Sequence, residues 1–168
     1  MKRPAFTLVE LIIVMTVMFI ISTITVISLN SYKYIKVDAA AKKVANDLEF
    51  TRNLALSMAK WYGVSFEVSP ANTYLVYQTN GIDDLPIEDP SRNGKNFIVN
   101  LYDYFGGATI SSVNISGGHK VEFSPLGVPY ADKNDPSGIA LTSSVTVEFS
   151  GLTKTIYIYP STGRITTQ

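Results

Sequence analysis

The sequence predicts an α+β protein in which one long N-terminal helix packs on antiparallel β-sheets. Neither proline nor glycine occurs between Pro4 and Gly63, so no helix breaker interrupts residues 6–62. From Gly63 onward, short β-branched and aromatic runs alternate with turns rich in Gly, Pro, Asn and Ser. The helix is therefore expected over residues 6–62, and a β-rich, β-sandwich-like globular domain over residues 63–168.

Composition excludes several classes of protein. Of 168 residues none is cysteine, so a disulfide scaffold and a thiolate zinc site are ruled out. The 14 cations balance 14 acids, which argues against nucleic-acid binding by bulk charge. An apolar fraction of 46% is too high for a disordered chain. The one histidine, His119, has no local catalytic partner, so we expect a surface residue and a protein that is not an enzyme.

The first half of the helix, residues 6–32, is predicted to be transmembrane. Residues 11–32 carry no charge, and as a helix they would extend about 33 Å, enough to cross a bilayer core. The hydroxyl residues in this stretch can bond back to the preceding helical turn. A short basic segment, residues 1–5, precedes it.

Two ordinary interpretations of this N-terminus leave one residue unexplained. A cleaved signal peptide has a shorter apolar core, followed by a site of small residues that is absent here. A plain membrane anchor fits the length. Neither explains the carboxylate of Glu10 at the edge of the apolar run, where a charge is unfavourable unless it lies at the interface.

The residues around Glu10 resemble a known processing site. Residues 5–10 read AFTLVE and are followed by LIIV, similar to the processing site of type IV pilins and type II secretion pseudopilins. The resemblance implies that residues 1–5 are a leader removed by a prepilin peptidase between Ala5 and Phe6. It further implies that the Phe6 amine is methylated and forms an intersubunit charge pair with Glu10. Ala5 departs from the family, which usually has Gly before the cut.

The second half of the helix, residues 33–62, is amphipathic and predicted to pack on the globular domain. Its mostly apolar stripe recurs at spacings of three and four residues, whereas the charged residues, Asp47 and Arg52 among them, fall off that stripe. The stripe consists of Val37, Ala41, Val44, Leu48, Thr51, Ala55, Met58 and Tyr62.

The remainder is predicted to be strands, joined by turns and by two irregular loops over residues 80–95 and 124–138. Two pairs of strands are expected to form hairpins, one across residues 69–72 and one across Ser150 and Gly151. The expected strands are residues 64–68, 73–78, 97–101, 109–115, 119–123, 139–149, 152–159 and, as an edge, 164–166.

Four short motifs extend the resemblance to the domain. They are TRNLAL at residues 51–56, FSPLG at 123–127, SGI at 137–139 and GRI at 163–165. Together they resemble the GspH/FimT-type minor pseudopilin domain, which implies a pilin-like fold. The absence of cysteine agrees better with that branch than with major pilins, which often carry a C-terminal disulfide.

Ligand sites are not expected, and no cofactor or metal is predicted. The acids of the two irregular loops lack the EF-hand spacing for calcium, so we interpret them as solvated. The body's cations are scattered, and Arg164 is the single cation of the C-terminal segment 163–168, expected at a strand edge. The acids are Asp83, Asp84, Glu88 and Asp89 in the first loop, and Asp132 and Asp135 beside Asn134 in the second.

The sequence therefore predicts a minor pseudopilin of a type II secretion system. Its expected partners are other pseudopilins or pilins through the N-terminal helix, the prepilin peptidase and the inner membrane, with the domain in the periplasm. Nucleic acid is not an expected partner. Three alternatives stay open: a minor pilin of a type IV pilus, a DNA-uptake module, and a membrane-anchored domain that never polymerises.

Overall fold

The computed structural model describes residues 7–135, 138–139 and 141–168, with the backbone alone for residues 24–30. Helix α1 (Leu8–Met58) occupies the first third of the chain. Over the described residues, no helix is both long and apolar enough to cross a bilayer. The predicted transmembrane half includes Phe6 and the side chains of residues 24–30, which lie outside the described residues.

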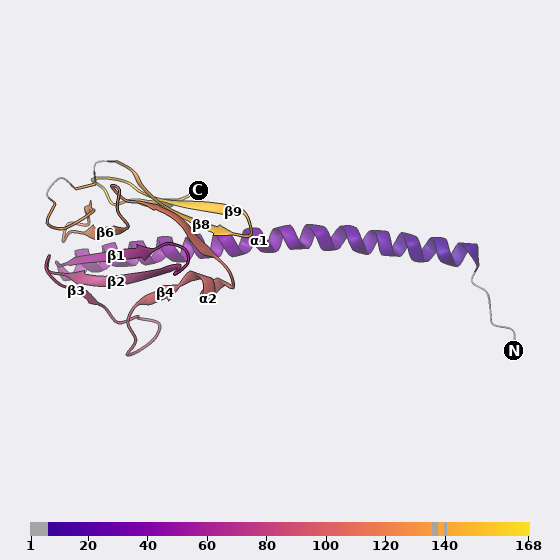
Figure 1. The fold of residues 1–168 in the computed structure, drawn as a ribbon, viewed down its shortest axis with the longest axis horizontal. Coiled ribbons are helices and arrows are strands. Elements are labelled where there is room, and N and C mark those ends of the chain that lie inside the picture. Colours follow the sequence, from indigo (N-terminus) through magenta and orange to yellow (C-terminus); the bar gives the residue numbers. More distant parts are fainter. Residues whose placement is uncertain (1–6, 136–137, 140) are drawn as a thin grey trace. The chain divides into compact units, whose positions relative to one another are not determined.

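The chain divides into two compact units, one ending at Ile35 and the other beginning at Lys36. The described residues of the second unit form the later part of α1, ten strands and a short helix. Within it, β1 (Trp61–Glu67) and β2 (Thr73–Thr79) run alongside α1 (Figure 1).

Helix α1 ends earlier than the sequence predicts. Ala59 adopts a left-handed conformation with φ of 51°, and the amide of Lys60 donates to the carbonyl of Ala55 at 3.3 Å, which closes the helix. Trp61 and Tyr62 then pair with Thr79 and Gln78 in the first sheet. The prediction of helix to residue 62 is therefore wrong. The apolar stripe could not reveal where the helix ends, because Tyr62 is buried in strand β1 and would also be buried if the helix continued to it.

The amphipathic stripe is otherwise confirmed. Its members from Val37 to Ala55 are buried, whereas Met58, at the end of the helix, is 58% exposed. One charged residue contradicts the pattern: Asp47, predicted to lie off the buried stripe, is itself buried. The confirmed members are Val37, Ala41, Val44, Leu48, Thr51 and Ala55.

The first sheet has six antiparallel strands in the order β3-β2-β1-β6-β7, with β4 (Ile98–Asn100) pairing with β2 beside β3. The predicted first hairpin is confirmed, with Glu67 opposite Thr73. Two of the strands shorten the expected loops, because β3 (Asp84–Pro86) and β7 (Pro129–Tyr130) lie in segments predicted to be irregular. Strand β6 (Lys120–Phe123) lies within the predicted strand 119–123.

The second sheet has four antiparallel strands in the order β10-β9-β8-β5. The predicted hairpin across Ser150 and Gly151 is confirmed, although its first strand begins four residues later than residue 139. The predicted edge strand also forms. The strands are β5 (Thr109–Asn114), β8 (Ser143–Phe149), β9 (Leu152–Ile158) and β10 (Ile165–Thr167).

A short helix replaces part of a predicted strand. Strand β4 (Ile98–Asn100) is followed directly by α2 (Leu101–Phe105), where the sequence predicts strand as far as residue 101. The Asn100 side chain accepts a hydrogen bond from the Asp103 amide, and Gly106 ends the helix in a left-handed conformation. The two residues that flank α2 therefore stabilise its ends.

Candidate assembly and interaction sites

The predicted processing and assembly residues fall partly within the structure. Ala5 and Phe6, the residues of the predicted peptidase site and methylated terminus, lie outside the described residues. Glu10 lies in the first turn of α1. Its predicted charge pair with the Phe6 amine of another subunit therefore stays a prediction.

Glu10 forms a capping box with Thr7 at the start of α1. The Thr7 amide and hydroxyl donate to Glu10 Oε2 at 2.9 and 2.8 Å, and the Glu10 amide donates to Thr7 Oγ1 at 3.3 Å. The Thr7 carbonyl accepts from the Leu11 amide, which makes Thr7 the N-cap. Glu10 thus has a role within its own chain that the sequence interpretation did not include, although the pattern Thr-x-x-Glu could have revealed it.

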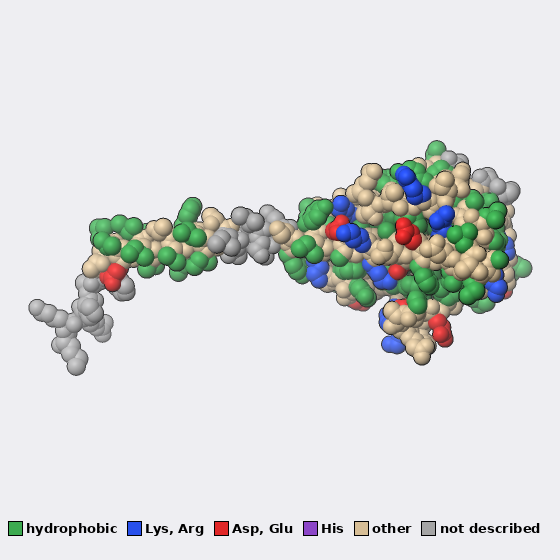
Figure 2. All heavy atoms as spheres, turned by 180° about the vertical axis from the view of Figure 1, so that it is seen from behind, with side chains coloured by type: hydrophobic (Ala, Val, Ile, Leu, Met, Phe, Trp, Pro, Cys, Tyr) green, Lys and Arg blue, Asp and Glu red, His purple; other side chains and the backbone are tan. Residues whose placement is uncertain are grey.

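The helix that follows the cap presents apolar side chains outward. The hydroxyls of Thr16 and Ser22 donate to carbonyls one turn earlier, Ile12 and Met18, at 2.7 and 2.8 Å, as the sequence predicts. In Figure 2, green hydrophobic side chains predominate on the visible face of the described part of this helix. An exposed apolar surface of this extent indicates a site of interaction with a membrane or with another protein. The exposed large apolar residues here are Leu8, Val9, Leu11, Ile12, Ile13, Val14, Met15, Val17, Met18, Phe19, Ile20 and Ile21.

Three of the domain motifs meet at one side chain, Arg52. Its Nε donates to the Gly127 carbonyl at 3.1 Å, and its Nη2 donates to the Thr162 carbonyl at 2.9 Å. A Cβ on Gly163 would lie 2.4 Å from the Gly127 oxygen and 2.8 Å from Arg52 Nε. Residues 51–56, 123–127 and 163–165 are therefore one junction between α1, the turn after β6 and the turn before β10. The fourth motif, at 137–139, lies partly outside the described residues.

A groove of about 440 Å³ lies beside this junction. Arg52 and Arg164 bring two cations to its lining, and Glu49 brings one acid. The Arg164 guanidinium lies over the ring of Tyr159 at 4.6 Å. Arg164 immediately precedes edge strand β10, which begins one residue later than the predicted edge strand 164–166. The predicted surface charge is thus also stacked on an aromatic ring.

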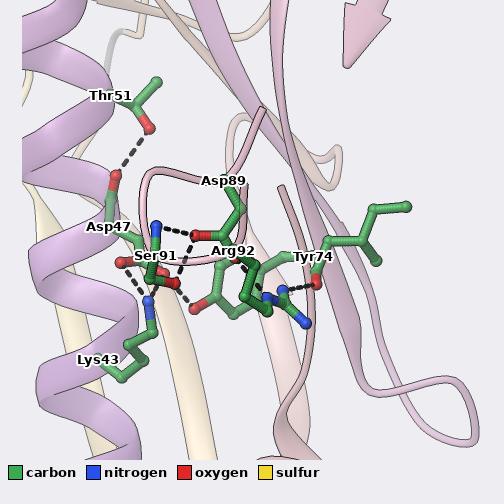
Figure 3. A network of polar contacts seen from close by, with 8 residues as sticks. Lys43, Asp47, Thr51, Tyr74, Asp89, Ser91 and Arg92 are labelled. Carbon is green, nitrogen blue, oxygen red and sulfur yellow. Dashed lines mark hydrogen bonds and ion pairs between the residues drawn. The ribbon is translucent and has the colours of Figure 1, made fainter. Parts of the chain in front are cut away.

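A buried polar cluster joins α1 to the first sheet (Figure 3). The Tyr74 hydroxyl donates to Asp47 Oδ2 at 2.5 Å, and Lys43 Nζ contacts both Asp47 oxygens at 2.7 Å. Burial and the neighbouring Asp47 carboxylate raise the pKa of Tyr74 well above its ordinary value, so the hydroxyl remains a donor. Asp47 is thus buried with its charge paired, which is the condition for burying a carboxylate.

The first acidic loop uses one of its acids for its own structure. Asp89 is only 4% exposed, so the interpretation of the loop acids as solvated is wrong for this residue. The Ser91 amide and hydroxyl donate to its Oδ1, and Arg92 Nε donates to its Oδ2 at 2.7 Å (Figure 3). Arg92 also donates to the Ile98 carbonyl at 2.7 Å, which ties the loop to β4.

The second loop is held by a buried carboxylate that the sequence analysis missed. Glu122 on β6 is 1% exposed and accepts from the Tyr77 hydroxyl at 2.9 Å, Lys120 Nζ at 3.1 Å and the Lys133 amide at 2.6 Å. Lys120 also pairs with Asp132 at 3.0 Å. In sequence Glu122 is an acid between Val121 and Phe123, which gave no signal that three donors would surround it.

Neither His119 nor the loop acids belong to a cluster of metal-ligating side chains in the part of the chain that the structure describes. His119 is exposed, and its backbone carbonyl accepts from the Phe66 amide at 2.8 Å. No three described His, Asp or Glu side chains group closely enough to hold a metal ion. Two of the loop acids are paired with cations instead: Asp89 with Arg92 and Asp132 with Lys120.

Comparisons with known proteins bear on the fold. No protein-family model matches the chain, and no curated protein sequence does. Among solved structures, the minor pseudopilin EpsH of the Vibrio cholerae Type 2 Secretion System matches with a TM-score of 0.56 at 10% identity, over 79% of this chain and 96% of that one. The type IV minor pilin FimU of Pseudomonas aeruginosa matches with a TM-score of 0.51 at 12% identity, over 81% and 90%. The chain therefore has a pilin-like α+β fold, as the sequence predicts.

Proposed function

We propose that the chain is a minor pseudopilin subunit of a type II protein secretion system, assembled into a short periplasmic pseudopilus that drives export. The observation that supports this most directly is Glu10 within the AFTLVE sequence, at the start of an apolar helix carried by a pilin-like domain. The proposed role is structural, with no catalytic activity of its own.

Assembly in this proposal depends on two opposite charges. Cleavage between Ala5 and Phe6 would give Phe6 a new cationic amine, one helical turn from Glu10. A head-to-tail contact in which neighbouring subunits are shifted by about one turn would place one subunit's amine against the next one's carboxylate. Pairing offsets the unfavourable desolvation free energy of each charge in apolar surroundings. It also fixes the register between the helices of neighbouring subunits.

The proposal places the chain in the inner membrane as a single-pass protein with its domain in the periplasm. It rests on the sequence, in which residues 11–32 carry no charge, and on the exposed apolar side chains from Leu8 to Ile21. Alkaline extraction of membranes tests it, because an anchored chain stays in the pellet whereas a peripheral one is released.

Mass spectrometry of the N-terminus tests the processing step. The expected result is a mature chain that begins at a methylated Phe6 when the peptidase is present, and an intact Met1 when it is deleted. A chain that begins at Met1 in both strains, or beyond residue 29, would contradict the proposal. Because Ala5 replaces the usual Gly, an Ala5→Gly variant is expected to be cleaved at least as fast.

A second candidate is a minor pilin of a type IV pilus, supported by the fold similarity to FimU. The fold is common to both systems, so the genes beside this one discriminate them: a secretin and secretion ATPase, or a retraction ATPase. A role in DNA uptake is disfavoured, because only Arg52 and Arg164 bring cations to the groove beside the C-terminal turn. A DNA shift assay at low salt tests that role.

A further inference from the structure

Two Asn-Gly pairs occur in the chain, Asn80–Gly81 and Asn93–Gly94, and they differ in their hydrogen bonds. Asparagine is a thermolabile residue, and glycine after it presents the least steric hindrance to reaction between side chain and backbone. Both asparagines are exposed, so access to water does not distinguish them. The hydrogen bonds of the two pairs, in contrast, distinguish them.

The first pair is held by bonds at both reacting groups. Asn80 Oδ1 accepts from the amides of Ile82 and Asp83, each at 2.8 Å, and the Gly81 amide donates to Thr79 Oγ1 at 3.0 Å. A Cβ on Gly81 would lie 2.8 Å from Asn134 Oδ1, so the backbone there has little room. Asn80 and Gly81 cannot approach one another without breaking these bonds.

The second pair is free of such bonds. Neither the Asn93 side chain nor the Gly94 amide has a hydrogen-bond partner among the residues that the structure describes. Gly94 has φ of 74°, and a Cβ added to it would have no atom within 4 Å, so the backbone can turn. The flanking residues, by contrast, are fixed, because the Lys95 amide donates to the Arg92 carbonyl at 3.1 Å.

We propose that Asn93 is a site of spontaneous deamidation and that the fold protects Asn80 from the same reaction. The Gly94 nitrogen attacks Cγ of Asn93, a new C–N bond forms, and the side-chain amide nitrogen leaves as ammonia with the proton lost from the Gly94 nitrogen. Water then opens the resulting succinimide at either carbonyl, which gives aspartate or isoaspartate at position 93.

The product changes the loop beside the Asp89–Arg92 pair. A new carboxylate appears one residue from Arg92, whose Nε lies 2.7 Å from Asp89. Isoaspartate also lengthens the backbone by one carbon inside the turn that Arg92 and Lys95 close. Both changes are expected to weaken the contacts of Arg92 with Asp89 and with the Ile98 carbonyl. Modified chains should therefore be cut more readily by protease between β3 and β4.

Peptide mapping of the aged, detergent-solubilised full chain tests this proposal. Folded protein kept in mildly alkaline buffer is expected to deamidate at Asn93 roughly tenfold or more faster than at Asn80, a ratio that corresponds to ~1.4 kcal/mol of barrier. In denaturant the two rates should converge, because the dipeptides are identical. Equal rates in the folded chain, faster reaction at Asn80, or no reaction at Asn93 when denatured chains react would each overturn it.

Two variants connect the rates to the contacts. Asn93→Gln is expected to abolish modification at position 93 and leave the rate at Asn80 unchanged. Thr79→Val removes the acceptor of the Gly81 amide and is expected to raise the rate at Asn80 several-fold, without altering that at Asn93. An unchanged rate at Asn80 in a folded Thr79→Val chain would contradict protection by that bond.

Discussion

The hydroxyl of Tyr74 on β2 donates a hydrogen bond to the buried carboxylate of Asp47 on α1 at 2.5 Å. Lys43, one turn before Asp47, completes the pairing from the partly exposed side. The contact joins a helix residue to a strand residue 27 positions later, so it forms only when the sheet has docked on the helix. It specifies how β2 lies against α1, in addition to stabilising the domain.

Tyr74→Phe is expected to lower the free energy of unfolding by about 1–3 kcal/mol, because a buried charged acceptor loses one of its donors. Urea unfolding, followed by the fluorescence of Trp61, the single tryptophan, measures it. Tyr102→Phe is the matched control: Tyr102 is 54% exposed, so its effect should stay within about 0.5 kcal/mol. Equal effects of the two variants would show that the buried bond contributes little.

The second unit is expected to fold without the first. Its hydrophobic core begins at Val37 and includes no described residue before it. A fragment of residues 34–168 should therefore give a cooperative unfolding transition and, without the proposed assembly helix, sediment as a monomer. A tight homodimer at micromolar concentration, or a fragment with no transition, would contradict this prediction.

Gly163 is expected to tolerate a side chain far less than Gly151. Both have positive φ, 63° and 82°, so alanine at either position is strained by about 1–2 kcal/mol. Only at Gly163 does the added Cβ also meet backbone, the Gly127 oxygen at 2.4 Å, whereas nothing lies within 4 Å at Gly151. Gly163→Ala should therefore destabilise the domain by about 1–3 kcal/mol more than Gly151→Ala.

Gly163→Ala combined with Arg52→Ala tests the junction around Arg52. If Arg52, Gly127 and Gly163 form one packed unit, Arg52→Ala and Gly163→Ala should be less than additive in a double-mutant cycle. Strict additivity would indicate that the clash at Gly163 is relieved without moving Arg52.

Much of this architecture was predictable because local rules and packing agree over most of the chain. The period of the helix stripe, the turn residues and the two hairpins all lead to the observed elements. One failure comes from a contact between distant segments, and another from a local cap. Asp47 was assigned to the polar face because no local signal shows that Tyr74 would reach it. Leu101 was assigned to a strand because the cap at Asn100 is a single residue in an aromatic run.

The candidate site was predictable only in part. The motif at residues 5–10 identifies Glu10, and the Thr7 cap could be recognised from spacing. The buried acids Asp89 and Glu122 could not be, because their burial depends on Arg92, Lys120 and Lys133, which lie in loops or on strand ends. Acids in polar loops are usually solvated, and composition alone cannot reveal the exceptions.

Asp89 is expected to make the stability depend on pH. Burial alone would raise its pKa, but the hydrogen bonds from Ser91 and Arg92 together outweigh burial, so the pKa lies below its ordinary value. A carboxyl with a lowered folded-state pKa stabilises the fold above the unfolded pKa of about 3.9, and this contribution is lost as the pH falls through the folded value. Urea unfolding from neutral to acidic pH measures it.

Asp89→Asn isolates this contribution. The difference in unfolding free energy between wild type and variant should be largest near neutral pH and shrink as the pH falls below about 4. Glu88→Gln is the control, because Glu88 is exposed and neighbours Asp89 in sequence. A difference between wild type and Asp89→Asn that is independent of pH would refute the assignment.

Glu10 has two candidate roles, and one set of variants separates them. It caps α1 through Thr7, and in the proposed filament its charge pairs with the Phe6 amine of a neighbouring subunit. Glu10→Gln keeps the capping box, which accepts Gln as well as Glu, but removes the charge. Thr7→Ala removes the cap and keeps the charge. Glu10→Leu removes both, and Glu10→Asp keeps a charge with a shorter reach.

If charge pairing drives incorporation, Glu10→Gln and Glu10→Leu should both lose co-purification with partner pseudopilins, Glu10→Asp should be intermediate, and Thr7→Ala should retain most of it. The unfolding of the domain should be unchanged in all four, since residues 36–168 form a separate unit. Membrane insertion and cleavage after Ala5 are also expected to be unchanged, because the uncharged residues 11–32 and the residues at the cut are kept. Wild-type co-purification of Glu10→Gln together with its loss in Thr7→Ala would instead assign Glu10 to capping the helix. Co-purification of Glu10→Leu at the wild-type level would show that Glu10 has no role in assembly.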